Sequence, residues 1–238
     1  MTFGSRLVFR DLSCRFPTGR VSVILGGSGS GKSTMLRLIG GLVRPSAGRV
    51  LVDGDDVAAL SERALFRVRR KLGMMFQGGA LLDSMTVFDN LALPLRERGE
   101  SESVIADAVH DRLGAVGLAD VDALLPGQLS GGMVKRVALA RAIIQRPVIL
   151  LVDEPFSGLD PISTRRIEHV LLEVNRKFGM TMIIVSHDVA STMRMADWMT
   201  LLLPERCVEG EPNALAQGPD AQVREFLSGE PSQPQAAG

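Results

Sequence analysis

Several residue types that mark particular protein classes are rare or missing in this chain. It has no tyrosine, an aromatic content of only 4%, and two cysteines among 238 residues. Cys14 and Cys207 stand far apart and lack the spacing of metal ligands, which excludes a cysteine-based metal site. We expect both to be buried free thiols, and such thiols favour a reducing compartment, the cytosol.

An excess of charge of either sign is also missing. Lysine plus arginine and aspartate plus glutamate number 27 each, so the net charge gives no reason to expect a nucleic acid or an anionic membrane surface as a partner. No segment approaches the roughly 18 consecutive apolar residues of a membrane-spanning helix. The N-terminus lacks the basic region and apolar core of a signal peptide. We therefore expect any role at a membrane to depend on a partner.

One glycine-rich stretch, by contrast, carries a specific pattern. Residues 26–33 read Gly-x-x-x-x-Gly-Lys-Ser, between an apolar run at 21–25 and a helix-compatible segment at 34–39. Glycines let the chain turn tightly and point backbone N–H groups at phosphate oxygens, and the N-terminus of the next helix attracts the same anion. The pattern predicts a P-loop, in which Lys32 reaches the β- and γ-phosphates and the Ser33 hydroxyl binds Mg²⁺. A Gly/Ser loop that matches by accident is the competing interpretation, and the flanking strand and helix disfavour it.

Strands and helices alternate in much of the chain. Apolar runs at 148–152 and 182–185 have the length of buried strands, with a helix predicted between them, and residues 6–16 alternate loosely like a further strand. Strand, helix and strand in this order imply a parallel sheet covered on both faces, with ligands at the carboxyl ends of the strands. The sequence therefore predicts an α/β fold.

The stretch from residue 78 to about 146 differs, because it has helical patterns and no clear strand. Thr86 begins a capping box, and Pro94 is expected to kink or end the helix that follows. We interpret this stretch as an inserted helical subdomain. Residues 231–238 are rich in Pro, Gln and Ala and are expected to form a disordered tail.

Ionisable residues follow two of the predicted strands. Asp153 and Glu154 end the first, where unpaired charge would be costly, and a metal ion with a water molecule explains the pair. Asp153 would then bind Mg²⁺ directly or from the second shell, and Glu154 would polarise the attacking water. His187 follows the second strand and can reach the γ-phosphate and the same water. Helix capping by the carboxylates and a purely structural histidine are the alternatives.

A second anion site is predicted at Ser130, Gly131 and Gly132, which open a further helix. Serine is a favoured N-cap, and the glycines leave the helix N-terminus bare, so the physics is that of the P-loop. The same residues also make an ordinary capped turn, and physics alone does not identify the anion.

Together these motifs resemble the ATP-binding cassette (ABC) ATPases over nearly the whole chain. The matching motifs are Walker A at 26–33, the Q-loop at Gln77, the signature at 129–133, Walker B with its glutamate at 148–154, the D-loop at 157–160 and the switch histidine at His187. Motifs of all these kinds in the family's order are highly specific. Met133 stands where the family has a glutamine, which should leave the serine and glycine contacts of the signature intact.

The resemblance implies a P-loop NTPase fold: a RecA-like core with a parallel sheet and a small antiparallel β part, interrupted by an α-helical subdomain. It implies a single ABC ATPase domain over residues 1–230. Within it, the core would comprise 1–77 and 147–210, the helical subdomain 78–146, and a C-terminal segment 211–230. ATP and Mg²⁺ would be the cofactors.

The resemblance also implies roles for individual residues. The catalytic residues would be Glu154, His187, Lys32, Gln77 and Asp160, and the metal ligands Ser33, Gln77 and Asp153. The nucleotide would be bound by Gly26, Gly27, Ser28, Gly29, Ser30, Gly31, Lys32, Ser33 and Thr34, and across a head-to-tail homodimer by Ser130, Gly131 and Gly132. Phe3 stands where the family has an aromatic residue that stacks on adenine, although the strand that normally precedes it is missing.

Two separated stretches narrow the resemblance to one subgroup of these ATPases. Residues 76–90 with 94–97, and 220–229 near the other end, are similar to ATPases that serve MCE-type phospholipid transporters, the Mla-like systems of Gram-negative envelopes. This similarity implies a motor subunit that moves phospholipids between envelope membranes, with a multi-span permease and an MCE-type lipid-binding protein as partners and no nucleic acid. It would lie at the cytoplasmic face of the inner membrane, held there only through the permease. A small-solute importer is the main alternative, and a soluble, non-transport ABC ATPase is a weaker one.

Overall fold

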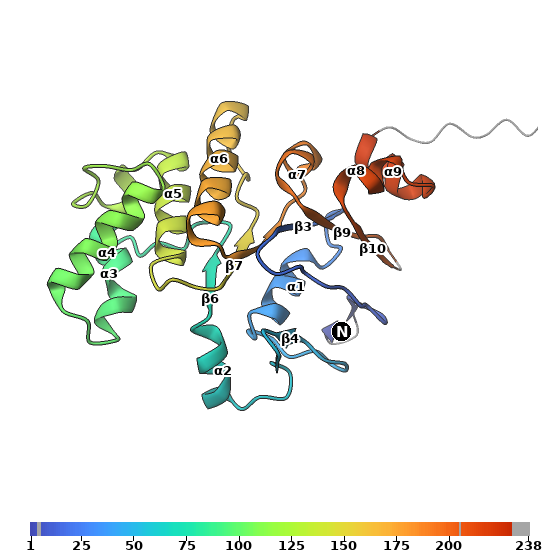
Figure 1. The fold of residues 1–238 in the computed structure, drawn as a ribbon, viewed down its shortest axis with the longest axis horizontal. Helices are drawn as coiled ribbons and strands as arrows, with labels where there is room; N and C mark the ends of the chain where they lie inside the picture. The colour runs from blue at the N-terminus through green and yellow to red at the C-terminus, as the bar shows by residue number, and fades with distance from the viewer. Residues whose placement is uncertain (4–5, 205, 230–238) are drawn as a thin grey trace, which may run out of the picture.

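A six-stranded sheet forms the centre of the computed structural model, which describes residues 1–3, 6–204 and 206–229 (Figure 1). Its strands are β3 (Val21–Gly26), β6 (Leu72–Met75), β7 (Ile149–Asp153), β8 (Thr181–Val185), β9 (Trp198–Leu202) and β10 (Cys207–Gly210). The order is β10-β9-β3-β8-β7-β6, and only β10, at one edge, runs antiparallel to its neighbour among these strands. The predicted parallel sheet is therefore confirmed, while the predicted tail at 231–238 lies outside the described residues.

Helices cover both faces of this sheet. Alternate residues of a strand point to opposite sides, and because the central strands carry apolar residues on both sides, both sides must be covered. In β7, Leu150 and Val152 belong to one apolar cluster and Leu151 to the other, and all three are 0% exposed. Helix α6 (Pro161–Phe178) packs on the side of Leu150, and α1 (Lys32–Ile39) on the side of Leu151. Burial on both sides explains why the central strands read as continuous apolar runs.

A group of helices lies beside the β6 edge of the sheet (Figure 1). It consists of α3 (Val87–Arg96), α4 (Glu102–Ala115), the short 3-10 helix η1 (Pro126–Gln128) and α5 (Gly131–Ala142). Residues 78–146, all of them described, contain no strand. Helix α5 packs against α3 and α4 and also against α6 and β6, so it joins this group to the sheet. The exact domain boundaries stay predictions.

The remaining elements are short. They are α2 (Glu62–Arg69), α7 (Val189–Met195), α8 (Pro212–Gln217), α9 (Ala221–Ser228), and the strand pairs β1 (Thr2–Phe3) with β2 (Arg6–Leu7) and β4 (Leu51–Val52) with β5 (Asp55–Asp56). Both pairs are antiparallel and supply the expected small antiparallel β part. Among the described residues, no helix has the length and apolarity needed to cross a bilayer.

The predicted strand over residues 6–16 is wrong beyond its first two residues. Only Arg6–Leu7 pairs with another strand. Leu12, Cys14 and Phe16 do point inward and pack on the core, with exposed residues between them. The alternation in the sequence is therefore real, but it reports alternating burial of an extended segment and not membership of a sheet.

Two predictions about single residues also differ from the structure. Helix α3 continues past Pro94 and ends two residues later at Arg96, so the helix does not end at the proline, and the kink stays a prediction. Cys14 and Cys207 are free, as predicted, but they are half-buried and not fully enclosed. Burial raises the pKa of the Cys14 thiol to about 12.

Candidate nucleotide-binding site

The loop between β3 and α1 holds the first group of predicted residues. β3 is buried along its whole length and delivers the chain to Gly26, and α1 begins at Lys32. Gly29 and Gly31 take φ angles of 76° and 98°, in the left-handed region that favours glycine. The second position is also crowded, because a Cβ on Gly31 would lie 2.6 Å from the Phe9 ring. The tight turn therefore depends on glycine at both positions.

Polar groups of this loop fit an anion. The Lys32 ammonium, in a residue only 9% exposed, donates hydrogen bonds to the backbone oxygens of Gly26 (2.9 Å) and Gly27 (3.0 Å). The Ser30 hydroxyl is buried and has no hydrogen-bond partner among the described residues. A buried hydroxyl without a partner is costly, and phosphate oxygens accept hydrogen bonds from hydroxyl, ammonium and backbone N–H groups. The predicted segment 26–34 thus comprises the turn after β3 and the first residues of α1, and it carries donors suited to phosphate.

A hydroxyl and a carboxylate meet at the start of α1. Ser33 Oγ donates to Asp153 Oδ1, at the end of β7, over 3.1 Å. Oxygen ligands of this kind suit Mg²⁺, which binds one or two protein oxygens together with water and nucleotide phosphates. No cluster of three or more His, Cys, Asp or Glu side chains that could hold a metal occurs in the described part of the chain. The pair therefore fits an Mg²⁺ ion that phosphate oxygens would help to hold.

The ends of β7 and β8 bring a carboxylate and an imidazole together. His187 Nδ1 lies 2.7 Å from Glu154 Oε2. Glu154 has a φ of 46°, which is uncommon for a residue with a side chain, and its N–H donates to the Val185 oxygen over 2.9 Å. The Glu154 side chain is 12% exposed and that of His187 68%. The pair is therefore fixed on its core side and open to solvent on the other, as handling a water proton requires.

The surroundings of Gln77, beyond the end of β6, include residues that the sequence analysis missed. The Gln77 side-chain amide donates to Ser157 Oγ over 3.2 Å. Its backbone oxygen accepts a hydrogen bond from the Lys135 ammonium of α5, and burial lowers the pKa of this lysine. A signal was present in the sequence, because Lys135 shares a helical face with Ala138 and Leu139, which are 1% exposed. A lysine on an apolar face needs a partner, and that partner is the Q-loop backbone.

Helix α5 holds the same loop at a second point. Arg141 donates to the backbone oxygens of Ala80 (2.6 Å) and Gly79 (3.0 Å). Burial lowers the pKa of the Arg141 side chain. Since Lys135 binds the oxygen of Gln77, basic side chains of one helix fix both ends of the segment from Gln77 to Ala80.

The structure does not bring the predicted residues at the starts of α5 and α6 to the P-loop within one chain. Ser130 caps α5, accepting a hydrogen bond from the Met133 N–H over 3.3 Å, and Gly131 begins the helix. Asp160 caps α6, where bonds from the Ser163 hydroxyl and N–H hold the pKa of its carboxyl below the usual range. Among the described residues, no hydrogen bond or ion pair joins Ser130, Gly132 or Asp160 to the P-loop.

Two further predicted contacts are not seen in the described part of the chain. The Gln77 side chain bonds to Ser157 and not to the candidate metal ligands Ser33 and Asp153. Phe3 contributes its backbone to β1, and its side chain lies outside the described residues. Both roles stay predictions.

A profile described as ABC transporter matches residues 9–157 of this chain. The chain belongs to the ABC transporter family. It is 43% identical to MlaF, the intermembrane phospholipid transport system ATP-binding protein of Escherichia coli K12. The aligned 230 residues cover 96% of this chain and 86% of MlaF. A probable ribonucleotide transport ATP-binding protein of Mycobacterium leprae, mkl, is 41% identical over 230 residues, which cover 96% of this chain and 66% of mkl.

Solved structures of ABC cassettes are similar as well. A dimeric post-hydrolysis state of the ATP-binding cassette MJ0796, bound to ADP and Pi, has a TM-score of 0.79 and 30% identity, covering 89% of this chain and 94% of that one. This likeness confirms the predicted P-loop NTPase fold. As an ABC ATPase, the chain binds ATP and hydrolyses it, and this activity is coupled to transport.

Proposed function

We propose that the chain is the ATP-hydrolysing subunit of a transporter that moves phospholipids between membranes of the cell envelope. The observation that carries this proposal is the 43% identity, over 96% of the chain, to a relative whose name states that cargo. The relative named for ribonucleotide transport is 41% identical, and the chain spans 66% of it, against 86% of MlaF. The more complete match favours phospholipid over a small solute.

Within the site, Lys32 and the N–H groups of the P-loop bind the phosphates of ATP. Ser33 and Asp153 would hold Mg²⁺, which would supply positive charge to offset the charge of the phosphates. Glu154 polarises the attacking water, and His187, 2.7 Å from it, holds the carboxylate in place and reaches the γ-phosphate. Gln77 would also contact the metal, and Asp160, in the D-loop, would be a further catalytic residue. The 3.1 Å contact of Ser33 with Asp153 supports the metal assignment.

A second copy of the chain supplies the contacts that one copy lacks. Ser130 and Gly131 are exposed at the N-terminus of α5, where unpaired N–H groups favour an anion. In a head-to-tail homodimer, Ser130, Gly131 and Gly132 would face the ATP that the partner's P-loop binds. The dimeric state of the similar cassette supports this arrangement. Phe3 would stack on the adenine.

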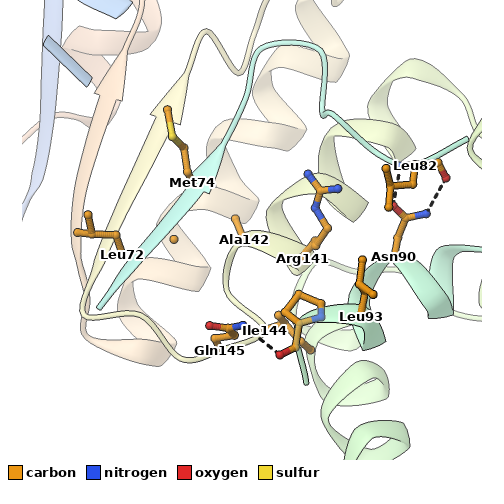
Figure 2. A pocket seen from close by; sticks show the side chains of 11 residues that line it. Leu72, Met74, Leu82, Asn90, Leu93, Arg141, Ala142, Ile144 and Gln145 are labelled. Carbon is orange, nitrogen blue, oxygen red and sulfur yellow. Dashed lines mark hydrogen bonds between the residues drawn. The ribbon is translucent and has the colours of Figure 1, made fainter. Parts of the chain in front are cut away.

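A groove beside the Q-loop offers a place for the permease (Figure 2). It has a volume of about 260 Å³ and lies between β6, α3 and α5. Its apolar lining includes Leu72, Met74, Leu82, Leu93, Pro94 and Ile144, and its polar lining Asn90, Arg141 and Gln145. Arg141 also donates to the backbone oxygens of Gly79 and Ala80. A permease segment that contacts Arg141 in this groove would therefore be linked to the Q-loop through that side chain. Through this contact the permease, which also carries the MCE-type protein, would hold the chain at the cytoplasmic face of the inner membrane.

Affinity purification from detergent-solubilised membranes tests this proposal. We expect a multi-span permease and an MCE-type lipid-binding protein to accompany the chain, and deletion of its gene to reduce the lipid asymmetry of the envelope. Leu93→Arg should lose the permease because it places a charge in the apolar groove, while Val104→Arg, at an exposed site on α4, should keep it. Recovery with a soluble solute-binding protein and an importer permease would overturn the phospholipid assignment.

A further inference from the structure

The outer surface of α2 carries an arrangement that the nucleotide site does not use. Arg63, Phe66, Arg67 and Arg70 are all exposed, and Phe66 is 63% exposed. Their spacing of i, i+3, i+4 and i+7 places them on one side of the helix and its C-cap. We call these four residues the basic face of α2.

The opposite side of α2 fixes the helix to the core. Leu65 and Val68 are 1% and 2% exposed. Arg69 donates to the Gly41 oxygen over 2.8 Å and to Glu62 over 3.2 Å. In Figure 1, α2 lies at the lower edge of the molecule, apart from the other helices. The core therefore sets the orientation of the helix, and the basic face points outward.

The arginines of the basic face lack acidic partners. No hydrogen bond, ion pair or ring contact of the Arg63, Arg67 or Arg70 side chains occurs among the described residues. Residues 62–71 contain five basic residues and one acidic residue, Glu62, whose carboxylate is taken up by arginines outside the basic face. The balanced charge of the whole chain thus hides a local surplus of positive charge.

We propose that the basic face of α2 binds the anionic headgroups of a phospholipid bilayer. The guanidinium group forms paired hydrogen bonds with phosphate oxygens. Each basic residue near an anionic membrane surface strengthens binding about fivefold. Phe66, between the arginines, exposes an apolar ring, and an apolar side chain beside basic ones suits the boundary between headgroups and acyl chains.

A bilayer matches this surface better than a protein partner does. A stable protein interface buries about 800 Å² on each partner and involves about 20–30 residues a side. The basic face offers four side chains on a projecting helix, and the groove of Figure 2 contains no residue of α2. A fluid layer of headgroups needs no matching pocket, because each phosphate can move to an arginine.

This inference rests on the proposed function, whose transporter brings the chain to a membrane, and it replaces the expectation that the permease alone holds the chain there. Its test uses the purified full-length protein alone. The test is flotation with vesicles of equal parts phosphatidylglycerol and phosphatidylcholine, compared with phosphatidylcholine alone. We expect flotation with the anionic vesicles only, weakened by salt. Combined Arg63→Ala, Arg67→Ala and Arg70→Ala should lower the partition coefficient about 100-fold, at about fivefold for each charge.

A matched control removes the same charge elsewhere. Arg49→Ala, Arg166→Ala and Arg176→Ala replace exposed arginines outside α2, and this variant should float like the parent protein. ATP hydrolysis of both variants should equal that of the parent, which shows that they fold. Failure of the parent to float, or equal loss in both variants, would overturn the inference. If the α2 variant floats normally but no longer co-purifies with the permease, the basic face contacts protein and the bilayer proposal is wrong.

Discussion

The carboxyl ends of the central strands and the N-terminus of α5 are both predicted to meet ATP, yet one chain assembles only the first. At the strand ends, Ser33 bonds to Asp153 over 3.1 Å and Glu154 lies 2.7 Å from His187. At the other site, the Ser130 hydroxyl accepts a hydrogen bond from the Met133 N–H of its own helix, and no bond to the P-loop occurs in the described part of the chain. The first set of groups is therefore assembled within one chain, whereas Ser130 and Gly131 lie exposed at the start of α5. We propose from this difference that a complete site needs two chains.

The largest effect should come from Glu154→Gln, which changes the strand-end set without altering the P-loop. The amide cannot take a proton from water, so kcat should fall by about 10²–10⁴-fold while ATP stays bound and a dimer accumulates. ATPase assays with size-exclusion chromatography measure both effects. Glu173→Gln is the matched control, because it changes another Glu–His contact, the 3.1 Å pair of His169 and Glu173 on the exposed side of α6, and should leave turnover unchanged. Near-normal turnover of Glu154→Gln would remove Glu154 from the mechanism.

Ser130→Arg changes the second region, the N-terminus of α5. A bulky cation at the cap of α5 should block closure of the dimer, so hydrolysis should fall by about 10²-fold or more while the ATP affinity of the monomer changes little. Nucleotide binding to diluted protein and steady-state hydrolysis separate the two quantities. Ser103→Arg, at an exposed site on α4, should have no effect. Equal loss of ATP binding in Ser130→Arg monomers would contradict the contrast between the two sites.

Lys135→Met tests the connection between the two regions. Lys135 lies on α5, and its ammonium donates to the backbone oxygen of Gln77, which follows strand β6. Methionine keeps the length and apolar character of the buried side chain but leaves the Gln77 oxygen without its charged donor. A charged hydrogen bond contributes about 1.5–3 kcal/mol, so kcat should fall about tenfold or more. Steady-state kinetics with thermal melting show whether activity falls more than stability does. Lys71→Met, at a half-exposed lysine, is the control. An unchanged kcat in Lys135→Met would mean that the hydrogen bond from Lys135 to Gln77 does not position the Q-loop.

Ser157→Ala should have the smallest effect. It removes the 3.2 Å hydrogen bond from the Gln77 side chain to Ser157, which is an ordinary neutral contact. Such a bond contributes about 1 kcal/mol, so the loss in kcat/KM should be at most about fivefold. A loss of activity as large as that of Lys135→Met would show that the contact of the Gln77 side chain, and not that of its backbone, positions the Q-loop.

Much of the strand-end set could be predicted from the sequence, because its signals are local. Glycines at 29 and 31 are required where φ is positive, and Asp153, Glu154 and His187 directly follow apolar runs that become adjacent strands. In a parallel sheet, consecutive carboxyl ends meet at one edge, so their contact follows from the order of elements.

Other features were missed because they depend on tertiary contacts. Lys135 finds its partner 58 positions away in the sequence, and only its place on an apolar helical face hinted at this. The alternation at 6–16 could not show whether a neighbouring strand was available. The basic face of α2 leaves no trace in the net charge, because acidic residues elsewhere in the chain balance its arginines.

Mixing two inactive variants tests the two-chain site most directly. Ser130→Arg keeps an intact P-loop, and Lys32→Ala keeps an intact α5 N-terminus, so one site of the mixed dimer combines both intact parts. Each variant alone should be inactive, Lys32→Ala because it loses phosphate binding. The account predicts that ATP hydrolysis returns when the two proteins are mixed at concentrations where the parent protein dimerises. A mixture that forms mixed dimers but stays as inactive as its components would contradict the claim that the site is shared between two chains.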